Sequence, residues 1–363
     1  MNRVHKQAEC GSAQGARRGA YLNLVSYLVQ RDSLWSPARV ARFVRYVLAK
    51  TGVQIGIFRI LALPAFRGAV GANPRFAIKY FWDGYLVRGF TVVERKCSFF
   101  HHYRRLREGM SSSFLHKMFS RSVVLLETRR GESCFEVTMG LSPEETEGEL
   151  SLILQVDGVT VFLLSFTIVP GWVVQSTVEE VLLITRLQGL RERSRQVAAA
   201  TKAFHDVGPE ALLLAVLQGF AEAFGVCELA CVAAAHHTAY REDSFADLKI
   251  AYDDFFTEHG AVKNEADFFV CPIPLPQKPL SEIKKGHKLR TRMKRAFKCQ
   301  IAEGVCRFLV ECRSATGDVS PYRVGSLSLE PPERQFAAEM AISSALPESQ
   351  GGWSGSQEAA EAG

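Results

Sequence analysis

The stretch that decides the fold is residues 180–194, which read EVLLITRLQGLRERS. Glu180 to Leu187 has the residue pattern of a strand, and Gln188-Gly189 marks a turn. A helical pattern follows from Ser194 to His205. The centre of the chain is therefore predicted to pass from a strand through a glycine turn into a helix.

The elements on either side of this stretch fall into two groups. Four strands precede it, and Asp157-Gly158 between the last two is typical of a tight hairpin. Alternating helices and strands follow it. This order predicts an α+β fold with a mixed, mainly antiparallel sheet flanked by helices. The expected strands before it are 123–128, 134–139, 150–156 and 160–169, and the expected elements after it are helix 209–224, strand 228–235, helix 245–257 and strand 267–271.

The ends of the chain differ from this central region. Residues 1–20 are expected to form a flexible basic N-terminus, and 21–90 an N-terminal helical segment in which only Phe76 to Trp82 resembles a strand. The main α/β domain is expected over 91–312, where residues Arg95 to Ser120 have helical character with a basic face. Residues 313–363 are expected to be a disordered, low-complexity tail.

Composition points to a globular protein of a reducing compartment. The chain of 363 residues is 47% hydrophobic, enough to bury a large core. Its nine cysteines are irregularly spaced and contain no Cys-x-x-Cys pair, which argues against a disulfide framework or a zinc module. The N-terminus lacks the apolar core of a secretory signal, and the most apolar runs are shorter than a membrane span. A cytoplasmic protein, peripheral at the inner membrane if it meets one, is expected.

Charge is distributed in blocks. The formal net charge is +6, yet residues 278–298 alone carry nine Lys or Arg against the single acid Glu282. The preceding segment, Arg241 to Asp267, is acidic. A dense basic block predicts an anionic partner, either a membrane phospholipid surface or an acidic macromolecule, with nucleic acid less favoured.

The basic block is predicted to form a cationic amphipathic helix. Leu289, Met293, Ala296 and Phe297 recur at helical spacing and leave the charges on the remaining surface. Such a helix can lie on an anionic membrane, grip phosphate, or pack its apolar stripe on the domain and leave its charges solvated. The candidate anion-binding residues are Lys284, Lys285, Lys288, Arg290, Arg292 and Arg295.

Residues with acid–base chemistry are scattered. The sequence contains neither a P-loop nor a dinucleotide-binding glycine motif, and the adjacent pairs His101-His102 and His236-His237 diverge too much to share a metal ion. His236 ends a predicted strand, where open sheets bind ligands, although a histidine that only caps the backbone is the commoner case. Asp254 and Glu258 share one helical face, which suits proton transfer or, more commonly, pairing with basic residues.

The turn after the central strand is a candidate cofactor site. Gln188, Gly189, Arg191 and Ser194 combine a small residue, basic charge and a helix start, the features that bind phosphate. A purely structural turn is the simpler alternative, because a single glycine is a weak signal.

Several short motifs, in a fixed order, resemble the VirK/YbjX-like family of bacterial proteins. They include Leu187-Gln188-Gly189, the run from Ala200 to His205, Tyr252-Asp253-x-Phe255-Phe256-x-Glu258-x-Gly260 and Ile283-Lys284-Lys285. The resemblance implies a bacterial protein without a known biochemical activity or accepted catalytic residues, linked through some members to virulence, surface-protein localisation and envelope stress.

The order of elements is also similar to that of GNAT-type acyl-CoA acyltransferases, in which the turn after the central strand holds pyrophosphate. By this fold-level analogy, the turn from Gln188 to Ser194 would bind acyl-CoA, and His236, Asp254 or Glu258 would carry the proton. The competing hypothesis is a non-enzymatic adaptor whose cationic helix touches the inner membrane or an acidic partner.

Overall fold

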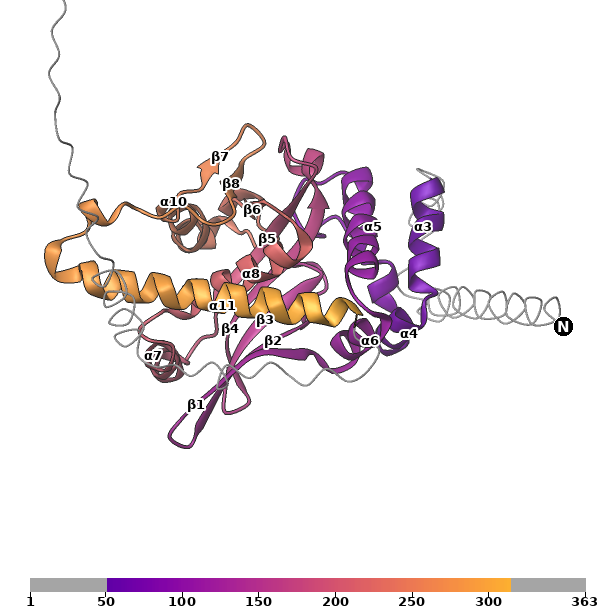
Figure 1. Cartoon of the computed structure of the whole chain (residues 1–363). Helices are drawn as coiled ribbons and strands as arrows, with labels where there is room; N and C mark the ends of the chain where they lie inside the picture. Colours follow the sequence, from indigo (N-terminus) through magenta and orange to yellow (C-terminus); the bar gives the residue numbers. More distant parts are fainter. Residues whose placement is uncertain (1–50, 315–363) are drawn as a thin grey trace, which may run out of the picture. The chain divides into compact units, whose positions relative to one another are not determined.

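The computed structural model describes residues 51–314, which form an eight-stranded sheet with helices packed on it (Figure 1). The mixed α+β class predicted from the sequence is confirmed. The helices expected within 21–50 and the tail beyond Ser314 lie outside the described residues. The strands are β1 Val123–Arg130, β2 Ser133–Leu141, β3 Leu150–Val156, β4 Val159–Pro170, β5 Glu180–Gly189, β6 Glu228–Val232, β7 Val262–Lys263 and β8 Phe268–Pro272.

The sheet is antiparallel except at one place. Its spatial order is β1-β2-β3-β4-β5-β6-β8-β7, so that the first five strands form a meander and β8 inserts between β6 and β7. β5 and β6 are parallel, and every other neighbouring pair is antiparallel. The turn between β3 and β4 has φ values of 51° at Asp157 and 77° at Gly158. Both angles suit the tight hairpin that this dipeptide predicts.

The helices begin and end at recognisable signals. Thr91 and Glu94 form a capping box at the start of α5, and Ser111 caps α6. α8 begins at Pro209 and ends before Gly225, whose φ of 72° suits a left-handed cap. The helices are α3 Thr51–Leu61, α4 Pro64–Ala72, α5 Val92–Gly109, α6 Ser112–Arg121, α7 Ser194–Ala203, α8 Pro209–Phe224, α9 Phe245–Lys249, α10 Phe255–Glu258 and α11 Lys288–Ser314.

One prediction of local structure is confirmed and one was wrong. The helical character expected over 95–120 is present as two helices, α5 and α6, which are separated at the extended residue Met110. The strand expected from Phe76 to Trp82 is a pair of 3-10 turns, η1 Pro74–Ala77 and η2 Lys79–Phe81. Residues 76–80 are all buried, because tertiary packing encloses this segment on every side and does not leave an alternating exposed face.

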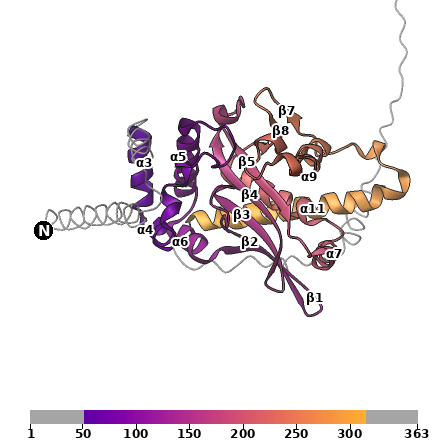
Figure 2. The ribbon, with the colours of Figure 1, turned by 180° about the vertical axis from the view of Figure 1, so that it is seen from behind.

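Helices α8 and α11 cover one part of the sheet. α8 packs against β3, β4 and β5, and α11 packs against α8, so that α11 crosses in front of the strands in one view and behind them in the other (Figures 1 and 2). The two helices approach closely at Gly219, where an added Cβ would lie 2.3 Å from the carbonyl oxygen of Ala302. Glycine at this position therefore sets the distance between them.

A buried ion pair joins the helical N-terminal part to the sheet. Lys79 Nζ lies 2.7 Å from Glu149 Oε2, and both side chains are almost fully enclosed. The hydroxyls of Tyr85 and Tyr103 also donate to the Glu149 carboxylate. A buried charge is costly without partners. Lys79 and the two tyrosine hydroxyls therefore stabilise the buried Glu149 carboxylate together.

Candidate functional site

The parallel strands β5 and β6 separate after a short contact. Their register covers only Leu182 with Leu229, Leu183 with Ala230 and Ile184 with Cys231. β6 then ends at Val232, whereas β5 continues to Gly189, paired with β4 alone among the described strands. The carboxyl ends of parallel strands that part from each other are where open sheets bind ligands.

β5 is also irregular at this point. Ser165 of β4 pairs with Arg186 and Phe166 pairs with Ile184, which leaves Thr185 as an extra residue in β5. Such a bulge bends the strand and re-aims the side chains that follow it. The bulge coincides with the end of the contact between β5 and β6.

Side chains from the segment after β6 fill the space between the two strands. The hydroxyl of Tyr252 accepts a hydrogen bond of 3.2 Å from the backbone N–H of Leu187 in β5. The Tyr252 ring lies 4.6 Å from the ring of His237, and both side chains are buried. Asp253 holds this helical segment in place by accepting a bond of 2.8 Å from the N–H of Ala234. Tyr252 belongs to a π-helical turn, Ile250–Asp254, a feature frequent at functional sites.

His237 is held in its neutral form. Burial, reinforced by the charge of Arg186 and opposed by the backbone of Thr185, lowers its pKa to about 4. Its Nδ1 accepts a bond of 3.0 Å from the N–H of Ala239, which leaves the proton on Nε2. Burial also raises the pKa of Tyr252 far above neutrality. Both residues therefore carry a proton at neutral pH, His237 on Nε2 and Tyr252 on its hydroxyl.

An ion pair borders the same space. Arg186 Nη1 lies 2.9 Å from Glu147 Oε2, and about 15% of each side chain is exposed. Thr238 Oγ1 donates to Glu147 Oε1 over 3.2 Å. We call Glu147, Arg186, His237, Thr238 and Tyr252 the strand-divergence site. It joins residues from four separate parts of the sequence into one polar cluster.

The acid–base candidates chosen from the sequence lie outside this cluster. His236 is 39% exposed, and its Nε2 is 3.4 Å from Asp267. Asp254 is half exposed and pairs with Lys249 at 2.7 Å, upstream of it and not with the downstream basic block. Glu258 is exposed. Sequence reasoning missed His237, although its neighbour was singled out, because the direction of each side chain after a strand end depends on the turn.

The turn after β5 leads from the strand-divergence site to the start of α7. Gln188 is exposed and its Oε1 accepts from Arg186 Nε at 3.1 Å, while Gly189 lies against the Phe162 ring. Arg191 and Ser194 are exposed, and no described side chain caps the first turn of α7. Backbone N–H groups of that turn therefore face outward beside a basic side chain.

The basic block forms the predicted helix, but its apolar stripe is buried only in part. Helix α11 begins at Lys288, and its buried face includes Phe297, Ile301, Ala302, Val305, Phe308, Leu309 and Cys312. Leu289 is 67% exposed, so the stripe that was expected to pack on the domain begins with a solvent-facing residue. Most of the buried residues of α11 lie beyond residue 298.

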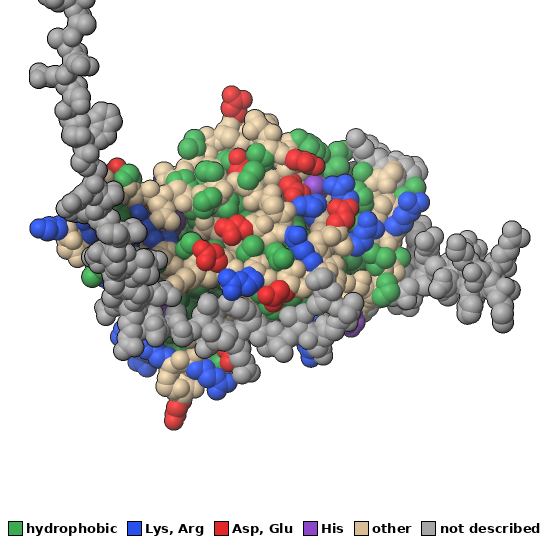
Figure 3. All heavy atoms as spheres, viewed as in Figure 1, with side chains coloured by type: hydrophobic (Ala, Val, Ile, Leu, Met, Phe, Trp, Pro, Cys, Tyr) green, Lys and Arg blue, Asp and Glu red, His purple; other side chains and the backbone are tan. Residues whose placement is uncertain are grey.

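The candidate anion-binding residues differ in their surroundings. Lys284, Lys285 and Arg292 are exposed, while Lys288 and Arg295 are half-buried. Arg290 pairs with Asp206 at 2.9 Å, and Arg295 donates to the carbonyl of Lys278. Lys and Arg side chains gather at the end of the molecule where α11 begins and near the β1–β2 hairpin (Figure 3). Most of these charges remain available to a partner.

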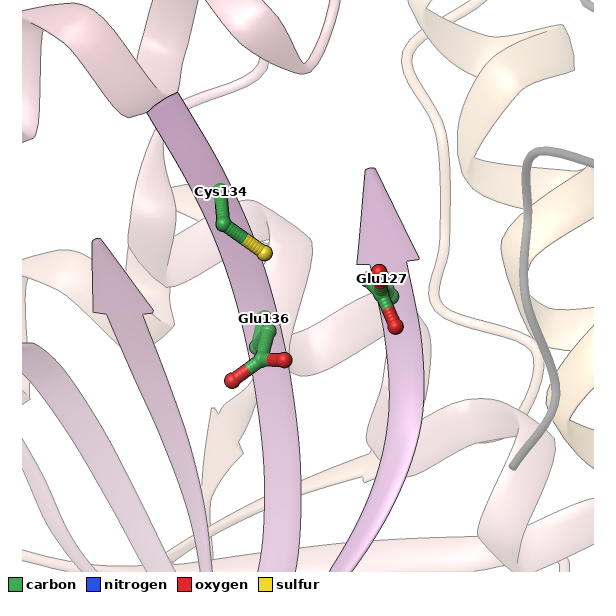
Figure 4. Close-up of side chains that lie close together, drawn as sticks. All are labelled: Glu127, Cys134 and Glu136. Carbon is green, nitrogen blue, oxygen red and sulfur yellow. The ribbon is translucent and has the colours of Figure 1, made fainter. Parts of the chain in front are cut away.

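Three potential metal ligands lie together on the β1–β2 hairpin. Glu127 and Glu136 are directly opposed, and Cys134 lies two residues before Glu136 on the same face (Figure 4). Their donor atoms lie within 4.8 Å of one another. Burial and the two carboxylates raise the pKa of the Cys134 thiol, which disfavours the thiolate that a metal ion needs. Arg129, 3.5 Å from Glu127, offsets part of the negative charge.

No single helix within residues 51–314 is both long and apolar enough to cross a membrane. The bent pair Gly52–Leu61 and Pro64–Val70 satisfies the length and composition criteria when its two helices are taken together.

Comparison with protein families gives one match over most of the chain. Residues 35–300 match the family described as a protein of unknown function, DUF535, which is the VirK/YbjX family. The chain belongs to this family. The resemblance found in the sequence motifs is thereby confirmed. Neither the curated proteins nor the solved structures include a match to this VirK-like chain.

Proposed function

We propose that this VirK-like protein binds acyl-CoA and transfers its acyl group at the strand-divergence site. The observation that carries the proposal is the separation of β5 from β6 after Ile184, which leaves the β5 edge bonded to a tyrosine side chain and not to a strand. The analogy with GNAT-type acyltransferases is supported by the single parallel pair in an otherwise antiparallel sheet, whose two strands are connected by a crossover through α7 and α8. The analogy concerns fold alone.

The turn from Gln188 to Ser194 suits the phosphate groups of such a donor. It continues directly from the free edge of β5 into the uncapped start of α7. Arg191 and Arg195 are exposed beside it. A helix start with outward N–H groups and flanking arginines attracts phosphate.

The chemistry requires a proton for the leaving thiolate. The acceptor, an amine or a hydroxyl, bonds to the thioester carbonyl carbon and the C–S bond breaks. The sulfur takes a proton from a donor side chain as CoA leaves, and the proton that the acceptor loses returns to that side chain. Tyr252, which accepts from Leu187 and retains its own hydroxyl proton, is our candidate donor. His237 Nε2–H is suited to stabilise the carbonyl oxygen as negative charge develops on it.

Thermal unfolding with added acetyl-CoA and palmitoyl-CoA tests this proposal. A ligand at one hundred times its Kd stabilises a protein by about 2.7 kcal/mol, which raises the Tm of a domain of this size by several degrees. Arg191→Glu with Arg195→Glu should remove the shift, whereas Arg307→Glu, an exposed charge reversal on α11, should preserve it. Absence of a shift with every acyl-CoA would refute the proposal.

A second function is favoured by the exposed basic residues at the start of α11. In it the protein acts without catalysis, as a cytoplasmic protein that meets an anionic partner, in envelope stress, surface-protein localisation or virulence. Lys284, Lys285 and Arg292 support it because they are exposed and have no role in the core. Retention on a heparin column, weakened by Lys285→Glu with Arg292→Glu and unchanged by Arg307→Glu, is the expected result. Passage of the unaltered protein through the column at low salt would contradict it.

A further inference from the structure

We propose that the segment from Lys278 to Arg292, here called the cationic tip, docks on an anionic lipid bilayer with the side chain of Leu289 inserted among the headgroups. The inference deepens the second function above, because it names the anionic partner, and it is independent of acyl transfer.

The first part of α11 is less buried than its remainder. No residue from Lys288 to Ala296 is fully buried, and the buried face starts only at Phe297. The rings of His205 and Phe297 contact each other at a tilt, with centroids 4.7 Å apart, at the point where the helix meets the domain. Before it, Leu289, Arg290 and Arg292 are exposed, and the other residues of these turns are half-buried.

Leu289 is an apolar side chain among charges. It is 67% exposed, while its neighbours Lys288 and Arg290 are basic. Ile283, half-buried, lies in the segment that leads into the helix. An exposed leucine side chain is in contact with water, and its transfer to the boundary between headgroups and acyl chains lowers the free energy.

The charge of the cationic tip complements an acidic lipid surface. The tip contains six Lys or Arg and one acid, Glu282. One of the bases, Arg290, is already paired with Asp206, and the others lie on the surface or half-buried. Each Lys or Arg near an anionic bilayer strengthens binding about fivefold, so that this set is sufficient for measurable attachment.

The exposed leucine favours a bilayer over a nucleic acid. Contacts to a nucleic acid backbone are made by charged and polar groups, and an aliphatic side chain adds little to them. A bilayer uses both kinds of group at once, because basic side chains remain at the phosphates while the apolar one enters more deeply. Leu289 is therefore the residue whose substitution separates the two partners.

Co-sedimentation of the full chain with liposomes tests the inference. We expect binding to phosphatidylcholine vesicles that contain phosphatidylglycerol, little binding to pure phosphatidylcholine, and release as salt rises from about 0.1 M to about 1 M. Leu289→Ser should weaken binding about tenfold. Lys285→Glu with Arg292→Glu should weaken it by a factor of about 25 or more.

The matched controls are Val310→Ser and Arg307→Glu, which alter exposed residues of the same helix outside the tip. Both should bind as the unaltered protein does. Because Leu289 and Val310 are exposed, all variants should keep the Tm of the parent, which excludes unfolding as a cause.

Three outcomes would overturn the inference, and they differ in what they leave standing. Equal binding to neutral vesicles would remove the charge argument. Unchanged binding of Leu289→Ser, with loss in the charge-reversal variant, would exclude insertion and leave the anionic-partner function intact. Tighter binding to a DNA duplex than to anionic vesicles, insensitive to Leu289→Ser, would make nucleic acid the partner.

Discussion

The hydroxyl of Tyr252 accepts a hydrogen bond of 3.2 Å from the backbone N–H of Leu187. It thereby replaces the acceptor that a neighbouring strand would supply. Sixty-five residues separate the two in sequence. The bond satisfies a buried donor that the divergence of β5 and β6 would otherwise leave without a partner. It also ties the helical segment after β6 to the central strand, so that His237 is enclosed between them.

Removing the Tyr252 hydroxyl should destabilise the fold. In Tyr252→Phe the Leu187 N–H remains buried without its acceptor, and we expect a loss of about 1–3 kcal/mol in the free energy of unfolding. Tyr240→Phe is the matched control, because that residue is only half-buried, and it should change stability by less than about 0.5 kcal/mol. Urea unfolding of both variants gives the comparison. Equal stability of the two would show that the bond has no net effect.

Stability should fall in mildly acidic solution. The pKa of His237 is about 4 in the folded protein and 6.5 in the unfolded chain, so the unfolded state binds the proton first. The stabilisation is complete above about pH 6.5 and is lost progressively as the pH falls towards 4, by on the order of 3 kcal/mol in total. Burial also lowers the pKa of His102, which steepens the same loss.

His237→Gln should flatten this pH dependence without abolishing it, since His102 remains. Denaturant midpoints measured between about pH 4 and pH 7 test this expectation, and His236→Gln, which alters the exposed neighbour, is the control. A parent and a His237→Gln variant with the same slope would contradict the role assigned to His237.

A side chain at Gly219 should separate α8 from α11. The Cβ of Gly219→Ala would lie 2.3 Å from the carbonyl oxygen of Ala302, and backbone atoms cannot yield as a flexible side chain can. We expect a loss of about 1–3 kcal/mol. Gly68→Ala, where the new Cβ meets nothing within 4 Å on α4, should be neutral or stabilising by up to about 1 kcal/mol. Thermal unfolding of both variants tests whether the close contact between α8 and α11 causes the loss of stability.

The Glu149 carboxylate should be required for folding stability. Glu149→Gln leaves the ammonium of Lys79 buried without a counter-charge, which costs about 3–5 kcal/mol. Adding Lys79→Met to this variant removes the stranded charge and should recover part of the loss. Chemical denaturation of both variants measures the coupling. A double variant less stable than the single one would argue against charge burial as the cause.

Local structure and family membership followed from the sequence alone. The strand from Glu180, the Asp157-Gly158 hairpin and the helix opened by Pro209 were predicted because each depends on a few adjacent residues with strong preferences. The ordered motifs around Leu187, Tyr252 and Ile283 identified the family for a similar reason, since each is contiguous. Features that depend on adjacent residues can therefore be predicted from the sequence.

Only the tertiary structure decided which of these residues meet. The parallel pairing of β5 with β6, and its end after Ile184, brought His237 and Tyr252 to Leu187 and left His236 in solvent. Likewise, the contact of α11 with α8 buried Phe297 and exposed Leu289. In an extended segment, adjacent side chains point in opposite directions, so a shift of one residue changes which of them is buried. Packing against distant segments fixes this choice. The sequence therefore determined the elements and the family, while packing between remote segments determined the site.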